Sequence, residues 1–176
     1  MNKIQQLKRE ELAYIAGFLD GDGSINAQIV QRVDYKLKFQ IRVTITFYQK
    51  TRRHWFVQFL HKKLGCGTIR KRPDGISEYA VVGSSSVKPV LQTLRPYLRI
   101  KRRQAVLVLK VIDSLSQYQD RQAFIKSCKL VDQIADLNDS KKRIITANYV
   151  RSKWDQLETI VPVETSIEEI EMPSSG

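Results

Sequence analysis

The chain has 176 residues, which is enough for a single domain with a sizeable core. Its two cysteines, Cys66 and Cys128, form no C-x-x-C pair, which argues against a zinc ribbon or a secreted disulfide scaffold. We therefore expect two reduced thiols that serve as small apolar packing residues. No apolar run is long enough to span a bilayer, and the first residues lack the apolar stretch of a signal peptide. Neither a membrane partner nor a targeting sequence is expected.

Charge is distributed unevenly along the chain. The formal net charge is +12, from 30 Lys and Arg against 18 Asp and Glu. Residues 154–176 hold six of the acids and no Lys or Arg, so residues 1–153 carry all 30 bases against the remaining 12 acids, an excess of +18. Such an excess repels itself in a compact fold and is usually balanced by a polyanion. Charge therefore favours a nucleic-acid-binding protein over a generally basic surface, without separating DNA from RNA.

The first half of the chain predicts the order helix, strand, strand, helix, strand, strand. Leu12, Ile15 and Leu19 recur at helical spacing, and this helix is expected to end near Gly21. After it, residues 37–48 alternate between a polar, basic face and an apolar face, as a half-buried strand does. The expected elements are a helix over 8–19, strands over 24–33 and 37–48, a helix over 51–64, and strands over 68–72 and 76–82 joined at Pro73-Asp74-Gly75.

The second half predicts helices only. They are expected over residues 84–94, 102–115, 120–137 and about 146–157. An α+β fold follows, in which an antiparallel four-stranded sheet packs its apolar face against helices. We expect one domain over residues 1–160 and an acidic, flexible tail over 161–176, where two prolines and four acids replace the amphipathic pattern.

A strip of small residues marks the first predicted helix. Ala13, Gly17 and Gly21 lie four residues apart and therefore share one face. Glycine inside a helix costs about 0.8–1 kcal/mol relative to alanine. A second helix that packs almost backbone to backbone against this face would explain the strip, as it does in membrane helix pairs.

Asp22 is expected at the C-terminal end of the same helix. The helix dipole is negative there and the last carbonyls lack intrahelical donors, so a carboxylate is unfavourable unless a cation joins it. The Asp22 carboxylate and the Gly21 carbonyl could form half of a Mg²⁺ site, because Mg²⁺ prefers oxygen ligands. A polar turn that ends the helix explains D-G-D-G equally well, and both interpretations stay open at this level.

The segment IAGFLDGDGS resembles the LAGLIDADG motif of homing endonucleases. The similarity continues through QIVQRVDYKLKFQIRVTITF, YQKTRRHWF, YLRIKRRQAVLVLKVID and LVDQIADLNDSK, and covers roughly residues 10–157. The chain is most similar to the single-motif, homodimeric branch encoded in organellar introns. This resemblance implies an αββαββα core with C-terminal helices, in which the sheets of two subunits form a saddle over DNA.

The resemblance also implies which residues carry the chemistry. Asp22 and the Gly21 carbonyl would bind the catalytic metal between two motif helices, which pair through Ala13, Gly17 and Gly21. By local match, Gln49, Arg53 and Lys101 would surround the scissile phosphate. Without the resemblance, ordinary phosphate attraction would be the favoured explanation of the two bases. Asp20 receives a structural or orienting role, and His54 and His61 are expected to be surface or packing residues.

The polar faces of the strands are the predicted DNA-reading surface, because a two-stranded ribbon fits the major groove. The candidate DNA-binding residues on these strands are Gln28, Arg32, Tyr35, Lys38, Gln40, Arg42, Thr44, Thr46, Arg70 and Arg72. Asn138, Ser140, Lys141 and Lys142 resemble a loop that contacts the DNA backbone in the family, and are expected to position the protein without reading sequence.

The resulting expectation is a homodimeric, Mg²⁺-dependent DNA endonuclease that makes a double-strand break in a long, pseudo-palindromic target and promotes homing of its host intron. Mn²⁺ is expected to support activity too, and Ca²⁺ to permit binding with little or no cleavage. The resemblance places the protein in a chloroplast or mitochondrion, where it would be made. Two alternatives stay open: an RNA-binding splicing cofactor (maturase), and a non-catalytic sequence-specific DNA-binding protein. The intact acidic motif and the basic residues near it favour cleavage.

Overall fold

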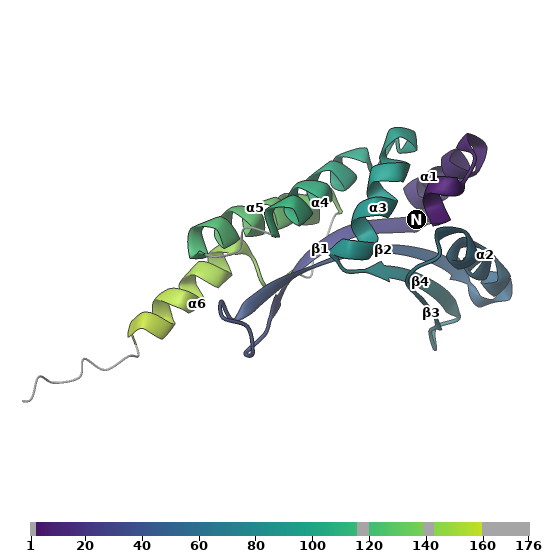
Figure 1. Cartoon of the computed structure of the whole chain (residues 1–176). Coiled ribbons are helices and arrows are strands. Elements are labelled where there is room, and N and C mark those ends of the chain that lie inside the picture. The colour runs from purple at the N-terminus through teal and green to yellow at the C-terminus, as the bar shows by residue number, and fades with distance from the viewer. Residues whose placement is uncertain (1–2, 116–119, 139–142, 160–176) are drawn as a thin grey trace, which may run out of the picture.

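The structure, a computed structural model, describes residues 3–115, 120–138 and 143–159. Four strands form one antiparallel sheet in the order β1-β2-β4-β3 (Figure 1). β1 (Gly23–Gln31) pairs with β2 (Phe39–Lys50) from Gly23 opposite Phe47 to Gln31 opposite Phe39. β4 (Ile76–Val82) pairs with the C-terminal half of β2, beginning at Thr44, and β3 (Thr68–Lys71) forms the outer edge. The sheet therefore narrows to a two-stranded ribbon at the end that precedes Thr44.

Helices cover one face of the curved sheet, with α3, α4 and α5 above it in Figure 1. The helices are α1 (Arg9–Asp22), α2 (His54–Leu64), α3 (Ser84–Leu94), α4 (Arg102–Leu115), α5 (Arg121–Leu137) and α6 (Ala147–Thr159), with short 3-10 turns at η1 (Lys3–Gln6), η2 (Thr51–Arg53) and η3 (Arg95–Tyr97). α6 supports the ribbon, since the Trp154 indole donates to the Leu37 carbonyl at 2.8 Å and its ring contacts Phe39. No helix within the described ranges combines the length and apolarity that a membrane crossing requires.

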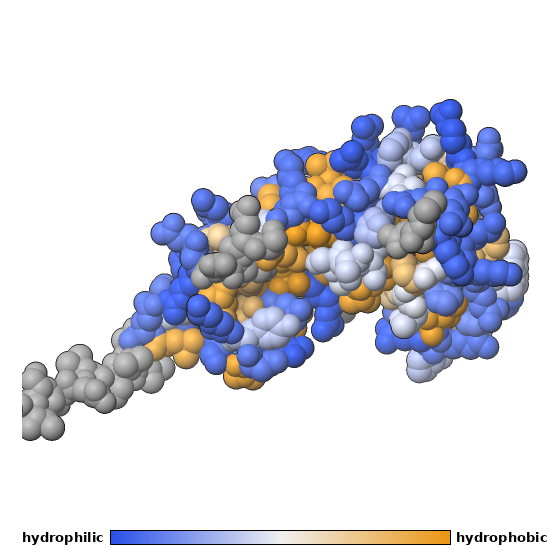
Figure 2. Space-filling view, in the orientation of Figure 1, coloured by the Kyte–Doolittle hydropathy of each residue, from blue (hydrophilic) through white to orange (hydrophobic). Residues whose placement is uncertain are grey.

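Strand alternation generates the core. Ile25, Ala27 and Ile29 of β1 and every odd-numbered residue of β2 from Phe39 to Phe47 are buried against the helices. Figure 2 shows the result from outside, with mostly hydrophilic side chains on the helices and hydrophobic residues gathered between them. Cys128 lies in this core, and burial raises the pKa of its thiol to about 12, so it is an inert packing residue as expected.

The α+β class, the antiparallel sheet and the order of elements confirm the prediction from sequence. The bounds of α3 and α4 agree with it residue for residue. The first hairpin differs, because strands were expected over 24–33 and 37–48. Residues 32–38 instead form a turn, closed by the Arg32 amide, which donates to the Lys38 carbonyl at 2.8 Å, and Lys38 adopts a left-handed φ of 61°. Arg32, Tyr35 and Lys38 therefore lie at the tip of the hairpin and not on a strand face.

Two helix expectations also needed correction. The predicted helix over 51–64 begins with the η2 turn, and α2 itself begins at His54. Trp55 and Phe59 belong to the helical apolar pattern of this segment, yet they are 63% and 37% exposed. The helix expected over 120–137 begins at Arg121. Asp120 is its N-cap, and the Asp120 carboxylate accepts from the Ala123 amide at 2.6 Å.

Candidate active site and sheet surface

The last turn of α1 brings two acids to different environments. Asp22 and its neighbour Gly21 are exposed at the helix end, whereas the Asp20 side chain is only 8% exposed. Asp20 points inward because residues two apart on a helix face different directions. The separation expected between an inward Asp20 and an outward Asp22 is present.

An open depression of about 420 Å³ lies beside Asp22. It is lined by Gly21, Asp22, Gly23, Tyr48, Gln49, Lys50, Arg53 and Ile76. The Gln49 side-chain oxygen accepts from the Arg53 guanidinium at 2.7 Å, which fixes the two side chains relative to one another. Three of the four side chains predicted for catalysis, those of Asp22, Gln49 and Arg53, therefore come together from α1, β2 and η2.

Lys101, the fourth predicted residue, is not part of that lining. It lies just before α4, and its ammonium group donates to the backbone carbonyl of Asp20 in the last turn of α1. The Asp20 carboxylate accepts from the Lys101 amide at 2.8 Å. Lys101 is thus held at the same helix end as Asp22, on the side that faces α4.

The donor set beside Asp22 fits half of a divalent metal site. One exposed carboxylate and one helix-terminal carbonyl are the oxygen ligands that Mg²⁺ and Ca²⁺ prefer. Within the described residues, no group of three His, Cys, Asp or Glu side chains could hold a metal within one chain. His54 hydrogen-bonds to the Ser77 hydroxyl at 2.9 Å, and His61 packs edge-on against Tyr79. These two contacts agree with the packing roles expected for both histidines.

No described residue packs on the small-residue strip of α1. Ala13, Gly17 and Gly21 are all exposed, and a Cβ added at either glycine would meet no atom within 4 Å. Packing within one chain therefore gives no reason for glycine at these two positions. Tyr14 is 55% exposed beside the strip, and its ring meets Phe56, which also contacts Trp55. Sequence reasoning missed Tyr14 and Trp55 as surface residues, because burial cannot be read from an aromatic helix pattern.

The open face of the sheet carries most of the predicted strand contacts. Gln28 and Arg42 are exposed and lie directly opposite one another on β1 and β2, and Gln40 and Thr44 flank Arg42 on the same face. Thr46 shares this face but is only 8% exposed. A single chain therefore does not present the Thr46 side chain at the surface, as a DNA contact would need. The face also includes residues that were not predicted, and alternation alone would have identified them: Ser24, Asn26, Thr68, Glu78 and Tyr48.

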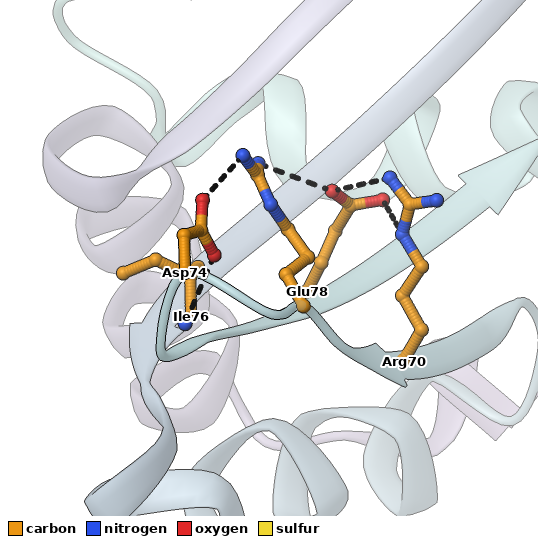
Figure 3. Close-up of polar contacts among 5 residues, drawn as sticks. Arg70, Asp74, Ile76 and Glu78 are labelled. Carbon is orange, nitrogen blue, oxygen red and sulfur yellow. Dashed lines mark hydrogen bonds and ion pairs between the residues drawn. The ribbon is translucent and has the colours of Figure 1, made fainter.

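Two predicted arginines of the second hairpin share one acid. Figure 3 shows the Glu78 carboxylate between Arg70 and the neighbouring guanidinium of Arg72. Arg70 makes a forked contact with both Glu78 oxygens, at 3.1 Å each, and Arg72 lies 3.7 Å from Glu78 and 2.6 Å from Asp74. Asp74 also accepts from the Ile76 amide, which anchors the turn. Both arginines are therefore oriented by acids before any ligand arrives.

The tip of the first hairpin contains a similar pair. The Arg32 guanidinium donates two hydrogen bonds to the Asp34 carboxylate, at 2.8 and 3.0 Å, and lies over the Tyr35 ring. The Arg32 guanidinium lowers the pKa of the Asp34 carboxyl to about 2, so the pair stays ionised at any pH where the protein works. The Lys38 ammonium donates to the Val33 carbonyl at 2.8 Å. These contacts hold Arg32, Tyr35 and Lys38 at the outer end of the ribbon.

The predicted backbone-contacting loop is described only at its ends. The Asn138 side chain donates to the Ile25 carbonyl at 2.9 Å and so ties the end of α5 to β1. On the far side, Arg143 pairs with Asp132 at 2.7 Å and donates to the Val131 carbonyl. The other predicted members, Ser140, Lys141 and Lys142, lie outside the described residues.

An acidic helix end, a polar sheet face and clustered basic residues together define an α+β protein built to act on a nucleic acid. The chain belongs to the LAGLIDADG endonuclease family, whose model matches residues 15–112. It is 47% identical over 160 residues to DNA endonuclease I-CvuI of Chlorella vulgaris, with 91% of this chain and 98% of that protein covered. It is also 44% identical over 153 residues to DNA endonuclease I-CreI of Chlamydomonas reinhardtii, with 85% of this chain and 91% of that protein covered.

Solved structures agree with this assignment. I-CvuI in complex with its target in the presence of 2 mM Ca matches with a TM-score of 0.81 at 46% identity, covering 85% of this chain and 95% of that one. I-CvuI with the I-CreI target in 2 mM Mg, in which the DNA is not cleaved, matches with a TM-score of 0.82. The match covers 87% of this chain and 98% of that one. The archaeal endonuclease I-Vdi141I, at 18% identity and a TM-score of 0.75, shows the same fold.

Proposed function

We infer that this chain is a site-specific DNA endonuclease that makes a double-strand break in a long, pseudo-palindromic target, and thereby promotes homing of a host intron. The observation that carries this inference is the depression that gathers Asp22, Gln49 and Arg53 beside the polar sheet face of a LAGLIDADG family member. Relatives that cover nearly the whole chain are named as DNA endonucleases. Neither alternative, a maturase or a non-catalytic binder, has an observation in its favour.

Asp22 and the Gly21 carbonyl would hold the metal, and Mg²⁺ is the proposed ion, with Mn²⁺ as a second that supports activity. When bound, such an ion supplies Lewis-acid stabilisation of the phosphate and makes a water molecule a stronger nucleophile. Gln49 would orient water through its amide, with Arg53 holding that amide in place at 2.7 Å. Arg53 and Lys101 place positive charge where the scissile phosphate develops negative charge. No protein side chain has to act as nucleophile.

The active enzyme is a homodimer in this proposal, because one chain supplies only one exposed carboxylate at the site. Two α1 helices that meet along Ala13, Gly17 and Gly21 would bring both copies of Asp22 together at the foot of the interface. A strip of three small residues buries little apolar area, whereas a stable interface buries about 1,200–2,000 Å² in total. The exposed aromatic side chains beside it, Tyr14 and Trp55, would supply part of the remainder.

DNA would lie against the open sheet face. Gln28, Gln40, Arg42, Thr44 and Thr46 on the first two strands and Arg70 and Arg72 on the second hairpin would face the major groove, with Arg32, Tyr35 and Lys38 reaching the outer base pairs. Asn138, Ser140, Lys141 and Lys142 would contact the DNA backbone.

We also propose that the protein is encoded in a chloroplast or mitochondrial intron and made in that organelle. The position of its coding sequence in the genome tests this proposal.

The experiment that tests the function is a cleavage selection. Incubating the protein and Mg²⁺ with a randomised DNA library and sequencing the new ends should recover one family of related sites. A strand of about 10 residues spans about 33 Å, or roughly 10 base pairs, so a dimer should protect on the order of 20 base pairs with an approximate dyad. Ends scattered without a common sequence, or a footprint of half this length, would contradict the proposal.

Base-reading and backbone-contacting residues should separate in binding measurements. Changing Gln40 or Arg70 to alanine should alter preference at particular base pairs by about 1–3 kcal/mol. Changing Lys141 or Lys142 to alanine should weaken binding to every sequence and flatten its salt dependence. Affinities for single-base target variants at two salt concentrations measure both effects. If Arg70→Ala shifts all variants equally, the arginine contacts only the backbone.

Replacing Glu78 by glutamine should loosen specificity while tightening non-specific binding. The change removes the acid that holds Arg70 and Arg72, and the loss of its negative charge makes the net charge of the DNA-facing surface more positive by one. We expect the ratio of cognate to non-cognate affinity to fall by about 10-fold, the equivalent of one misplaced bidentate contact. Glu158→Gln on α6, which removes an exposed partner of Arg121, is the matched control. An unchanged ratio would show that Glu78 does not orient the arginines.

A further inference from the structure

Both oxygens of the Asp20 carboxylate accept hydrogen bonds from the turn that precedes α4. Oδ2 accepts from the amides of Arg99 at 2.7 Å and Ile100 at 3.2 Å, and Oδ1 accepts from the Lys101 amide at 2.8 Å. The side chain is 8% exposed. A buried carboxylate that accepts three backbone N–H groups can hold a loop in one conformation.

The same turn begins α4 and carries Lys101. The Lys101 carbonyl accepts the first helical hydrogen bond, from the Ala105 amide at 3.0 Å, so the direction of α4 depends on this turn. The Lys101 side chain then folds back, and its ammonium group donates to the Asp20 carbonyl. Asp20 therefore accepts two hydrogen bonds from Lys101, one from its backbone amide and one from its ammonium group. The C-terminal end of a helix attracts a cation, which favours this arrangement.

We infer that Asp20 is a positioning residue for Lys101 in the cleavage reaction. By fixing the turn over residues 99–101 it places the Lys101 ammonium group at the end of α1 that presents Asp22, two residues further on. The inference rests on the proposed function, since Lys101 acts there on the scissile phosphate. It assigns the two acids of the motif to different tasks: Asp22 faces the reaction, and Asp20 orients the lysine.

Asp20 is poorly available as a metal ligand. Three of the roughly four acceptor positions of a carboxylate are used by backbone amides, and the group is turned away from the depression that Asp22 lines. Asparagine at position 20 would keep the shape but present an amide N–H₂ to backbone donors. The turn would then shift, and a shift of about 1 Å in a catalytic group costs on the order of 100-fold in rate.

A double-mutant cycle tests the inference. Asp20→Asn should lower kcat on the selected target by about 100-fold while KM and the affinity for DNA in Ca²⁺ stay within a factor of about 2. Lys101→Met removes the ammonium group but keeps the chain length. In that background Asp20→Asn should change kcat by less than about 3-fold, because the residue through which Asp20 acts is already gone. Asp113→Asn, an exposed acid on α4 paired with Lys88, is the matched control and should cleave at the wild-type rate.

An equal loss in kcat in the Lys101→Met and wild-type backgrounds would overturn the inference, as would a loss that appears wholly in KM or DNA affinity. If Asp20→Asn does not form a folded dimer, Asp20→Glu provides the second variant. It keeps the charge but displaces the carboxylate, and the same dependence on Lys101 is expected. Failure of the wild-type protein to cleave any DNA would instead remove the proposed function. The amide NMR signals of Arg99 and Lys101 in the free protein report the hydrogen bonds to Asp20 even then.

Discussion

Replacing Asp22 with asparagine should lower the rate of DNA cleavage in Mg²⁺ by on the order of 1,000-fold and leave target affinity nearly unchanged. The substitution removes the exposed carboxylate at the end of α1, where a cation is needed to offset the negative helix end. It changes none of the sheet residues that are proposed to face DNA. Single-turnover cleavage and a binding titration on the same target measure the two effects separately.

Substituting Ca²⁺ for Mg²⁺ in the wild-type protein should produce the same separation, because Ca²⁺ takes oxygen ligands but prefers looser geometry and activates water less well. Asp113→Asn removes an exposed acid of the same size far from the depression, and should leave the cleavage rate unchanged. An Asp22→Asn variant that cuts at the wild-type rate would exclude Asp22 from the site.

A leucine at Gly17 should abolish dimer formation and cleavage together. In the isolated chain an added side chain at Gly17 meets open space, so the fold of each subunit should survive. Against a second α1 helix the same side chain would force the two backbones apart and separate the two copies of Asp22. We expect the dimer dissociation constant to rise by at least about 30-fold, since overpacking costs about 1–3 kcal/mol for each copy. Sedimentation velocity measures association, and circular dichroism checks the fold.

Alanine at the same position is the informative control. Helix propensity alone predicts that Gly17→Ala stabilises an isolated α1 by about 0.8–1 kcal/mol. A close helix contact predicts the opposite for the dimer, because the methyl group occupies the space the partner needs. A more stable chain with weaker association would locate the contact at this strip. An intact and fully active Gly17→Leu dimer would place the interface elsewhere.

Periodicity predicted the elements better than it predicted their ends. The α+β class and the helices α3 and α4 follow from apolar spacing, which burial in the core enforces. The first hairpin was misjudged at residues 32–38, because the turn depends on a left-handed Lys38 that no glycine or asparagine signals. Trp55 and Phe59 satisfied a helical apolar pattern, yet both are exposed and are only partly covered, by contacts such as those with Phe56.

The site could be predicted only in part. Asp22, Gln49 and Arg53 were assigned by resemblance, and the fold brings them to one depression although they come from three elements. The hydrogen bonds of Asp20 to residues 99–101 could not be predicted, because they join segments about 80 positions apart. Likewise, Glu78 became visible as the acid shared by Arg70 and Arg72 only when strand register placed it opposite Arg70. Long-range pairing of this kind follows from packing and is absent from local patterns.

The narrowing of the sheet has a consequence for how a protein of this kind acquires new targets. Gln28, Gln40 and Arg42 lie on a ribbon of two strands, which twists more easily than the four-stranded part that carries Gln49. α6 supports the outer end of that ribbon through Trp154 and Leu37, and α4 and α5 pack against β1. Substitutions on the ribbon can therefore be absorbed by a local change of twist, without moving the centre where cutting occurs. Target preference should drift fastest at the two ends of the recognised sequence and slowest at its middle, so that recognition changes from the outside inward while activity is retained.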